Sequence, residues 1–425
     1  MMKLDFYKPI AIPILFVLPL VTAAVAFAQS PDELDELPLS QAQARTMAIE
    51  IESYWTPERM AEAKPMTAIF DELALPPYND DLDEKAMALE GEQVLPGYAP
   101  GWKPGRHAQA QPAADVEYII TPDHPLWNLA TGGVADEDGY AQPQHGSKPS
   151  NPRTGPYGPF QRWTEFDSIT VYPKSTHGKL FFSLNGSNFV CSATVIHRNT
   201  LITAGHCNSS GNGTFATNRL FCPSYRNGQH ATRGCWTVIN SKTSANWHTN
   251  GDPDYDYACL ITQKTGTKVA NQIGNVTGWL GRAWNWSHSQ AVKTFGYPAA
   301  SPFNGNRLIT TASTEWYDHH FRSGGQVSKL IGSDLTGGSS GGSWVLGWQG
   351  PGHFSDSDGN SATNPGSNWV NGVNSHKRCL TNCQSSPTNT NGVFWQEMSS
   401  PPFRNTSAAD ESEDIIQICF NNGGT

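Results

Sequence analysis

The sequence predicts an all-β fold built from small barrels. Glycine (40) and proline (30) are frequent among the 425 residues and only 16% of the residues are charged, which is typical of turn-rich β proteins. Eight cysteines favour an oxidising compartment. From about residue 179 onward, short apolar runs alternate with Gly/Asn/Ser turns, which is the pattern of antiparallel strands that close into barrels.

The first 28 residues have the composition of a secretory signal peptide. Two lysines precede an uncharged apolar run that starts at Ile10, and an A-x-A cleavage site ends at Ala28. Two prolines in the run and its small-residue end favour cleavage over a membrane anchor. We therefore expect a secreted protein, extracellular or periplasmic, that has no membrane contact once residues 1–28 are removed.

Residues 29–161 carry nearly all of the negative charge, with 8 Lys and Arg against 22 Asp and Glu. A helical pattern over residues 41–60 is followed by an acidic stretch and then by a Pro/Gly-rich run over 96–159. We interpret 29–161 as an acidic propeptide with a loose linker, which inhibits its own catalytic domain over 162–425. A retained acidic binding domain is the alternative. No basic patch for nucleic acid is present.

Strands in 162–425 are predicted from β-branched and aromatic runs between turns. Residues 180–184 and 189–196 flank an Asn185-Gly186 turn and predict a hairpin, with a third strand at 201–204. Further predicted strands are 236–239, 256–261, 291–295, 307–311, 343–346 and 369–373. The last segment, 410–419, starts acidic and ends apolar, which predicts a short helix.

Two distant motifs carry the chemistry. Residues 203–207 read TAGHC and place His206 at the end of a strand, and residues 338–342 read GSSGG and place Ser340 in a tight glycine turn. A serine hydroxyl is a poor nucleophile at neutral pH, so it needs an imidazole that takes its proton and an acid that orients the imidazole. The pair therefore predicts a hydrolase with an activated serine.

The acid is expected between the two motifs. Residues 252–261 read DPDYDYACLI, and Asp256 opens the apolar run, whereas Asp252 and Asp254 lie in the preceding turn. We therefore choose Asp256. The GSSGG motif also fits the nucleophile elbow of α/β-hydrolases, which would indicate a lipase or esterase. That fold requires its acid and histidine after the serine, where the only histidines are His353 and His376 in Gly/Asn/Ser-rich stretches. It also requires alternating strands and long helices, which the region before Ser340 lacks.

The order His206, Asp256, Ser340 resembles that of the chymotrypsin-like serine peptidases, whose motifs read TAxHC, D-[ILY]-A and G-[DS]-S-G-G. The resemblance covers about the last 260 residues. It implies two six-stranded antiparallel barrels with the active site between them, a serine endopeptidase acting through an acyl-enzyme on protein or peptide substrates, and no cofactor. It also implies that the backbone N–H groups of Gly338 and Ser340 bind the oxyanion.

The resemblance assigns further residues to the substrate cleft. Ser375 would donate to Asp256, and the segment that ends at His376 would line the cleft. Asp334 lies where trypsin-like enzymes bind Arg or Lys, which favours cleavage after basic residues. Lys377 could neutralise Asp334, and Asn374 stands where a histidine for glutamate recognition is expected, which argues against a glutamate preference.

Ser339, where the animal digestive enzymes have an aspartate, and the lack of an I-V-G-G-like start resemble the bacterial branch that includes glutamyl endopeptidases. Activation would then proceed by removal of the propeptide, with Arg153 or Arg162 as cleavage points. A monomer is expected. A catalytically silent secreted binding protein on the same fold stays an alternative, as does an esterase that uses the same serine.

Eight cysteines suit four disulfides, although spacing alone leaves their connectivity open. Cys191 and Cys207 match the family bridge that pins the histidine loop. Cys222 with Cys235, and Cys379 with Cys383, are neighbours that could close local loops, and Cys259 with Cys419 is then left by elimination. No metal site is expected, because no paired C-x-x-C occurs.

Overall fold

The computed structural model describes residues 40–66, 68–71, 93–95, 97–98, 144–145, 160–165, 169–227, 233–286, 290–319, 328–348, 368–381, 393–394, 396–405 and 411–422. All of them belong to one compact unit, Leu34–Thr425. The predicted signal peptide over 1–28 lies outside the described residues, as does most of the predicted linker. Among the helices that are described, none is both long enough and apolar enough to span a membrane.

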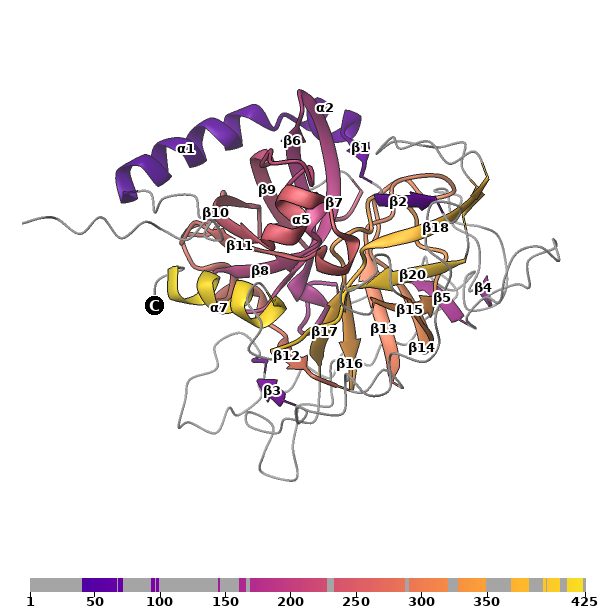
Figure 1. Cartoon of the computed structure of the whole chain (residues 1–425). Coiled ribbons are helices and arrows are strands. Elements are labelled where there is room, and N and C mark those ends of the chain that lie inside the picture. Colours follow the sequence, from indigo (N-terminus) through magenta and orange to yellow (C-terminus); the bar gives the residue numbers. More distant parts are fainter. Residues whose placement is uncertain are drawn as a thin grey trace, which may run out of the picture. The chain divides into compact units, whose positions relative to one another are not determined.

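The first sheet forms a closed six-stranded antiparallel barrel (Figure 1). The strands follow the order β7-β6-β9-β10-β11-β8, and β8 pairs back to β7, while the short strand β1 adds to the outer edge of β7. Their bounds are β1 Lys64–Pro65, β6 His177–Leu184, β7 Ser187–Val195, β8 Thr200–Thr203, β9 Thr217–Pro223, β10 Trp236–Thr243 and β11 Ala258–Thr262.

Local sequence explains the start of this barrel. Asn185 and Gly186 both have positive φ, 49° and 76°, which is the conformation that a two-residue hairpin turn between twisted strands requires. Every residue of β6 is buried, because one face of the strand lies in the barrel and the other is covered by neighbouring elements. The predicted hairpin is therefore confirmed.

The second sheet has six antiparallel strands at its centre, in the order β20-β15-β14-β13-β16-β17. The two ends of this run meet where the Ser375 N–H, directly after β17, donates to the Ser399 carbonyl of β20 at 2.9 Å. The bounds are β13 Ala291–Gly296, β14 Ile309–His319, β15 Ser328–Gly332, β16 Ser343–Leu346, β17 Trp369–Val373 and β20 Glu397–Ser400. With the C-terminal helix described below, this confirms the predicted fold class.

Several short strands extend these sheets. Within the second sheet, β12 pairs with β17 and β3, and β5 pairs with β14 and β4. A third sheet has the order β19-β18-β2. The bounds are β2 Ala68–Asp71, β3 Gln93–Leu95, β4 Gln144–His145, β5 Phe160–Thr164, β12 Gly281–Trp284, β18 His376–Thr381 and β19 Val393–Phe394. The predicted domain boundary at residue 162 falls inside β5 and stays a prediction.

The helices lie at the edges of the barrels. The C-terminal helix, α7, starts at an acidic turn as expected and is held by a disulfide to β11 and by a 2.6 Å ion pair between Glu413 and Arg282. The α-helices are α1 Gln41–Tyr54, α2 Pro57–Glu62, α5 Ala245–Asn250, α6 Ile273–Thr277 and α7 Ser412–Asn422. The 3₁₀ turns are η3 Lys174–Thr176, η4 Gly205–Cys207 and η5 Pro253–Tyr255.

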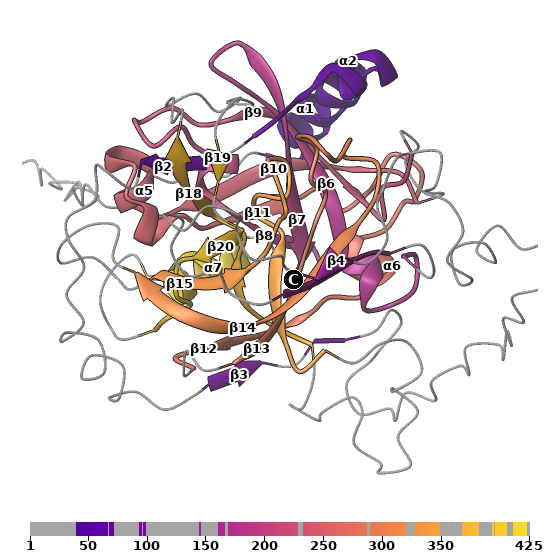
Figure 2. The ribbon, with the colours of Figure 1, turned by 90° about the vertical axis from the view of Figure 1, so that its right-hand side faces the viewer.

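The segment over residues 40–66, inside the predicted propeptide, packs onto the first barrel. Helix α1 is capped by a capping box of Ser40 and Gln43 and lies along β9 and β10 (Figures 1 and 2). Ile51, Trp55 and Met60 are buried in the same apolar core as the barrel strands. The N-terminal segment is therefore ordered against the fold rather than separate from it.

Three disulfides join described cysteines in the expected pairs: Cys191–Cys207, Cys222–Cys235 and Cys259–Cys419. The first joins β7 to η4, and the last fixes α7 to β11. Cys383 and the side chain of Cys379 lie outside the described part of the chain, so their pairing stays a prediction.

Candidate active site

His206 and Asp256 form the buried centre of the site. His206 lies in η4, directly after β8, and the Cys191–Cys207 disulfide fixes this turn against β7. Its Nδ1 lies 2.8 Å from Asp256 Oδ2, and its backbone N–H donates to Asp256 Oδ1 at 2.7 Å. A carboxylate on Nδ1 selects the tautomer in which Nε2 carries a free lone pair, which is the form that accepts a proton.

The Asp256 carboxylate is fully buried and receives three hydrogen bonds. The third comes from the Ser375 hydroxyl, which donates to Oδ2 as expected from the sequence. Burial alone raises the pKa of Asp256, but attraction to His206 and the hydrogen bonds from His206 and Ser375 outweigh it and lower the pKa below its ordinary value. Asp254, the discarded alternative, instead accepts from Ser328 Oγ at 2.7 Å.

Ser340 is held in a glycine turn that packs against β8, the strand that leads to His206. Gly338 and Gly341 have φ values of 96° and 78°, in the region that favours glycine. A Cβ at Gly341 would lie 2.0 Å from Thr203 Oγ1, so no other residue fits there without displacing the strand that carries His206. This close approach explains the GSSGG motif better than a flexible linker does.

Two buried side chains that the sequence did not identify hold the Ser340 turn. Ser192 of β7 donates through its N–H to the Ser340 carbonyl at 2.7 Å and through its hydroxyl to the Gly338 carbonyl at 2.9 Å. Asn374 donates to the Ser339 carbonyl at 3.1 Å, and its own carbonyl accepts from the Gly341 N–H at 2.7 Å. The sequence marked Asn374 only as the residue that stands where a histidine for glutamate recognition is expected, and it gave no signal for Ser192.

The Ser340 hydroxyl faces a backbone carbonyl of the N-terminal segment. It donates to the Met66 carbonyl oxygen at 3.3 Å, and the Gly338 N–H donates to the same oxygen at 2.8 Å. His206 Nε2 is buried and has no hydrogen-bond partner among the described residues. The atoms that an acyl transfer needs are thus an alcohol, a backbone donor aimed at a carbonyl oxygen, and an imidazole nitrogen with its lone pair free.

The predicted cation-binding carboxylate, Asp334, is already paired within the chain. Arg162 of β5 forms an ion pair with its Oδ2, and Lys377 contributes further positive charge. Burial raises the pKa of Asp334, and the attraction of Arg162 and Lys377 opposes that rise only in part. A basic substrate side chain would have to displace Arg162, so the reason for expecting basic specificity is weakened.

Arg162 is also unsuited as a propeptide cleavage point, because it is buried in β5 and pairs with Thr311 of β14. Arg153 lies outside the described residues. Lys377 is buried beside Asp334, and its Nζ donates to the Ser333 carbonyl at 3.3 Å. Burial lowers the pKa of Lys377 to about 8, although Asp334 and Glu397 oppose the shift.

His376, the other residue expected in the cleft, lies at the start of β18 and is buried. Its Nδ1 lies 2.6 Å from the Ser375 hydroxyl. Ser375 therefore connects the Asp256 carboxylate to a second imidazole. The structure thus places His376 next to the expected triad, in contact with it through Ser375.

One cluster in the described part of the chain has the composition of a metal site: Cys191, His206 and Cys207. The two sulfurs are bonded to each other, and the imidazole Nδ1 is engaged by Asp256, so these atoms do not form a set of free ligands. The cluster is better explained as the disulfide that fixes the histidine turn.

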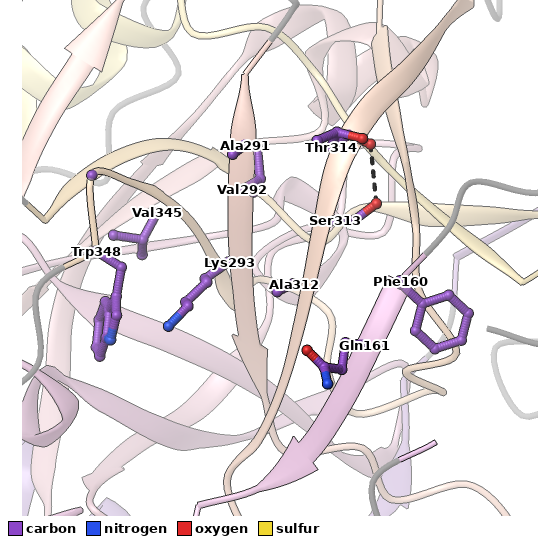
Figure 3. Close-up of a pocket in the computed structure, with 11 residues that line it drawn as sticks. Phe160, Gln161, Ala291, Val292, Lys293, Ala312, Ser313, Thr314, Val345 and Trp348 are labelled. Atoms are coloured by element: carbon purple, nitrogen blue, oxygen red, sulfur yellow. Dashed lines mark hydrogen bonds between the residues drawn. The ribbon is translucent and has the colours of Figure 1, made fainter. Parts of the chain in front are cut away.

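A shallow pocket of about 680 Å³ lies elsewhere, over β5, β13, β14 and β16 (Figure 3). The side chains of Lys293 and Trp348 line one side of it, and the Ser313 hydroxyl bonds to the Thr314 carbonyl at 3.0 Å on the other. None of His206, Asp256 and Ser340 lines it, so this pocket is separate from the site described above.

No family model matches the chain. The extracellular metalloprotease of Bacillus subtilis strain 168 is 26% identical over 145 residues, which are 33% of this chain and 44% of that protein. The match thus spans less than half of the relative's length.

Solved structures match a larger part of the chain. Protease Anisep from Arthrobacter nicotinovorans is 30% identical, covers 62% of this chain and 98% of its own, and has a TM-score of 0.46. The thermostable serine protease AL20 from an extremophilic microorganism is 30% identical, covers 57% of this chain and 97% of its own, and has a TM-score of 0.44. A Glu endopeptidase is 16% identical, covers 64% of this chain and 99% of its own, and has a TM-score of 0.41.

Proposed function

We propose that the chain is a chymotrypsin-like serine protease, which hydrolyses peptide bonds through a catalytic triad of His206, Asp256 and Ser340. The observation that supports the triad most is the pair of hydrogen bonds from His206 to Asp256. The glycine turn that holds Ser340 packs against Thr203, at the end of the strand that leads to His206. The chain's own residues supply every group that such a reaction needs.

The reaction starts when the Ser340 hydroxyl oxygen attacks the carbonyl carbon of the scissile peptide bond and its proton passes to His206 Nε2. Asp256 stabilises the resulting imidazolium, and Ser375 helps to keep the carboxylate charged. The N–H groups of Gly338 and Ser340 bind the oxyanion. When the C–N bond breaks, His206 gives the proton to the departing amine, and water then hydrolyses the ester on Ser340.

The proposed mechanism explains why residue 338 is a glycine. Its φ of 96° turns the N–H toward the carbonyl oxygen that it binds, and removal of one such donor costs on the order of 3 kcal/mol of transition-state stabilisation. Ser192 and Asn374 hold the turn from both barrels. They act as positioning residues, because neither is expected to touch the reacting atoms.

The protein is made as a secreted zymogen and acts as a monomer in this proposal. Three disulfides among the described residues suit an oxidising compartment, and the N-terminal residues 40–66 cover the first barrel next to Ser340. The preference for a basic residue before the scissile bond has less support, because it needs a free Asp334 and Arg162 occupies that carboxylate.

A serine-directed phosphonate tests the proposal on processed protein. We expect covalent labelling at Ser340, proteolysis of casein, and loss of both in a folded Ser340→Ala variant. Ser339→Ala is the matched control: its hydroxyl bonds to the Thr336 carbonyl, so it should keep most of the activity. Unchanged proteolysis in Ser340→Ala would contradict the triad, and hydrolysis of esters but not of peptides would favour an esterase.

A further inference from the structure

We propose that residues 64–66 and 68–71 form a built-in inhibitor, which occupies the Ser340 site with the Met66 carbonyl and pairs in parallel with one strand at each end. The inference rests on the proposed function, since it takes Ser340 as the nucleophile. It goes further by naming the inhibitory residues, the direction of the chain and the reason that the bound segment is not hydrolysed.

The first observation is the contact at the nucleophile. The Gly338 N–H, the proposed oxyanion donor, bonds to the Met66 carbonyl oxygen at 2.8 Å, so this oxygen lies where a substrate carbonyl would lie. The Ser340 hydroxyl donates to the same oxygen at 3.3 Å. A proton used in that bond is not directed to His206 Nε2, so the site is filled without being arranged for attack.

The second observation is the pairing on both sides of Met66. On one side, β1 is parallel to β7, with Lys64 opposite Phe189, and the Met66 N–H bonds to the Val190 carbonyl at 3.0 Å. On the other side, β2 is parallel to β18, with Ala68 opposite His376 (Figure 2). The described residues before and after position 67 therefore pair with the first barrel and with the strand that follows Ser375.

These strand edges are what an extended substrate would use. An added peptide strand binds a sheet edge through the backbone N–H and C=O groups of that edge. Here β1 takes the edge of β7 and β2 takes that of β18, so residues 64–66 and 68–71 compete with a substrate for the same hydrogen bonds. The blocked edges and the blocked Ser340 belong to a single continuous segment.

The third observation is the anchor that holds the segment in place. Trp55 is buried against Phe181 of the first barrel, with ring centroids 5.4 Å apart, and its Nε1 donates to the Asn218 carbonyl at 2.5 Å. The Tyr54 hydroxyl bonds to Asn188 at 2.8 Å. Because the anchor is part of the same chain, it raises the local concentration of the inhibitory segment at Ser340.

It follows that one cut after residue 71 would not by itself open the site. The segment would stay bound through its anchor until it dissociates or is degraded. Activation then has two steps, cleavage of the linker and release of residues 40–71. The bond between Met66 and Thr67 is not the activating cleavage site.

The rate of Ser340 labelling by a serine-directed phosphonate tests this in the full chain. We expect the full chain to react at least tenfold more slowly than protein processed by limited proteolysis. Trp55→Ala, which removes the anchor, should speed labelling of the full chain at least tenfold. Ile49→Ala on the same helix is the matched control, because Ile49 is 58% exposed, and it should leave the rate unchanged.

Met66→Pro is a second variant, at a position outside the barrel strands. It removes the N–H that bonds to Val190 and should also speed labelling of the full chain. Equal labelling rates for full and processed chains would overturn the inhibitor while leaving the proposed function standing. No labelling of either form would instead contradict the proposed function.

Mass spectrometry of the incubated full chain tests whether the bound segment is hydrolysed. We expect the bond between Met66 and Thr67 to stay intact while casein added to processed protein is digested. Cleavage of that bond in the full chain, with none in Ser340→Ala, would show that the segment is a substrate rather than an inhibitor.

Discussion

Two aspartates, Asp256 fully buried and Asp334 mostly buried, show how differently the two parts of the site are built. Asp256 receives three hydrogen bonds, from the backbone and ring of His206 and from Ser375, and its pKa is lowered. Asp334 has an ion pair to Arg162 on one oxygen, while its Oδ1 is buried without a hydrogen-bond partner among the described residues, and its pKa is raised.

The difference teaches that a carboxylate withdrawn from solvent is not by itself a functional one. The environment of Asp256 keeps a negative charge in place and orients an imidazole with it, which is what a proton transfer to His206 needs. The environment of Asp334 disfavours its charge and compensates it with a cation of the same chain. We therefore propose Asp256 as the catalytic acid and regard Asp334 as closed to a basic substrate in this form.

The largest expected effect comes from replacing the two carboxylates one at a time. Asp256→Asn should lower kcat by about 10⁴-fold, because the carboxamide no longer selects the His206 tautomer. Asp334→Asn, which keeps the side-chain shape, should change kcat less than tenfold. Steady-state rates of processed protein, normalised by titration of reactive Ser340, measure both; similar losses would remove the distinction between the two sites.

The contrast also explains what the sequence could predict. His206, Asp256 and Ser340 each lie in a short motif whose local pattern shows a strand end or a glycine turn, and the structure joins the first two directly. The partner of Asp334 is 172 residues away, in a strand that the predicted domain boundary at residue 162 divides. Its pairing depends on tertiary structure, so no local pattern reports it.

The prediction of the fold was limited in the same way, because strands without a local apolar pattern could not be recognised from the sequence. Strands with apolar alternation, such as β6 and β7 around Asn185, were predicted closely. Strand β20 reads EMSS and β9 carries Asn, Arg and Pro, so neither has the apolar alternation that indicates a strand, although β20 is wholly buried. Likewise, nothing local to Met66 indicates that its carbonyl reaches Ser340, because that contact spans 274 residues.

The next largest effect should come from freeing Asp334. Arg162→Ala removes its cation, so a substrate Arg or Lys could take that place. We expect the ratio of kcat/KM for an Arg substrate over a Leu substrate to rise about tenfold, within the range that one pocket contact supplies. The double variant Arg162→Ala/Asp334→Asn should lose this gain, and an unchanged ratio in Arg162→Ala would mean that Asp334 does not face the substrate.

A smaller effect is expected from the third donor to Asp256. Ser375→Ala removes one hydrogen bond to a buried carboxylate, and we expect kcat to fall about tenfold, since hydrogen bonds to charged groups contribute about 1.5–3 kcal/mol. Ser399→Ala is the control. Its hydroxyl is also buried but bonds to the His376 backbone, so kcat should change less than twofold. Equal losses would mean that Ser375 acts only through packing.

The smallest effect separates the two carboxylates by pH. Asp256, whose pKa is lowered, adds stability above its unfolded value of 3.8 and loses it as pH falls through the folded pKa. Asp334, whose pKa is raised, adds stability below 3.8 and loses it as pH rises through the folded pKa. In a Ser340→Ala background that cannot digest itself, the Tm cost of Asp256→Asn should therefore grow with rising pH and that of Asp334→Asn should shrink. Thermal unfolding between pH 3 and 6 measures both, and parallel trends would contradict the opposite environments of the two carboxylates.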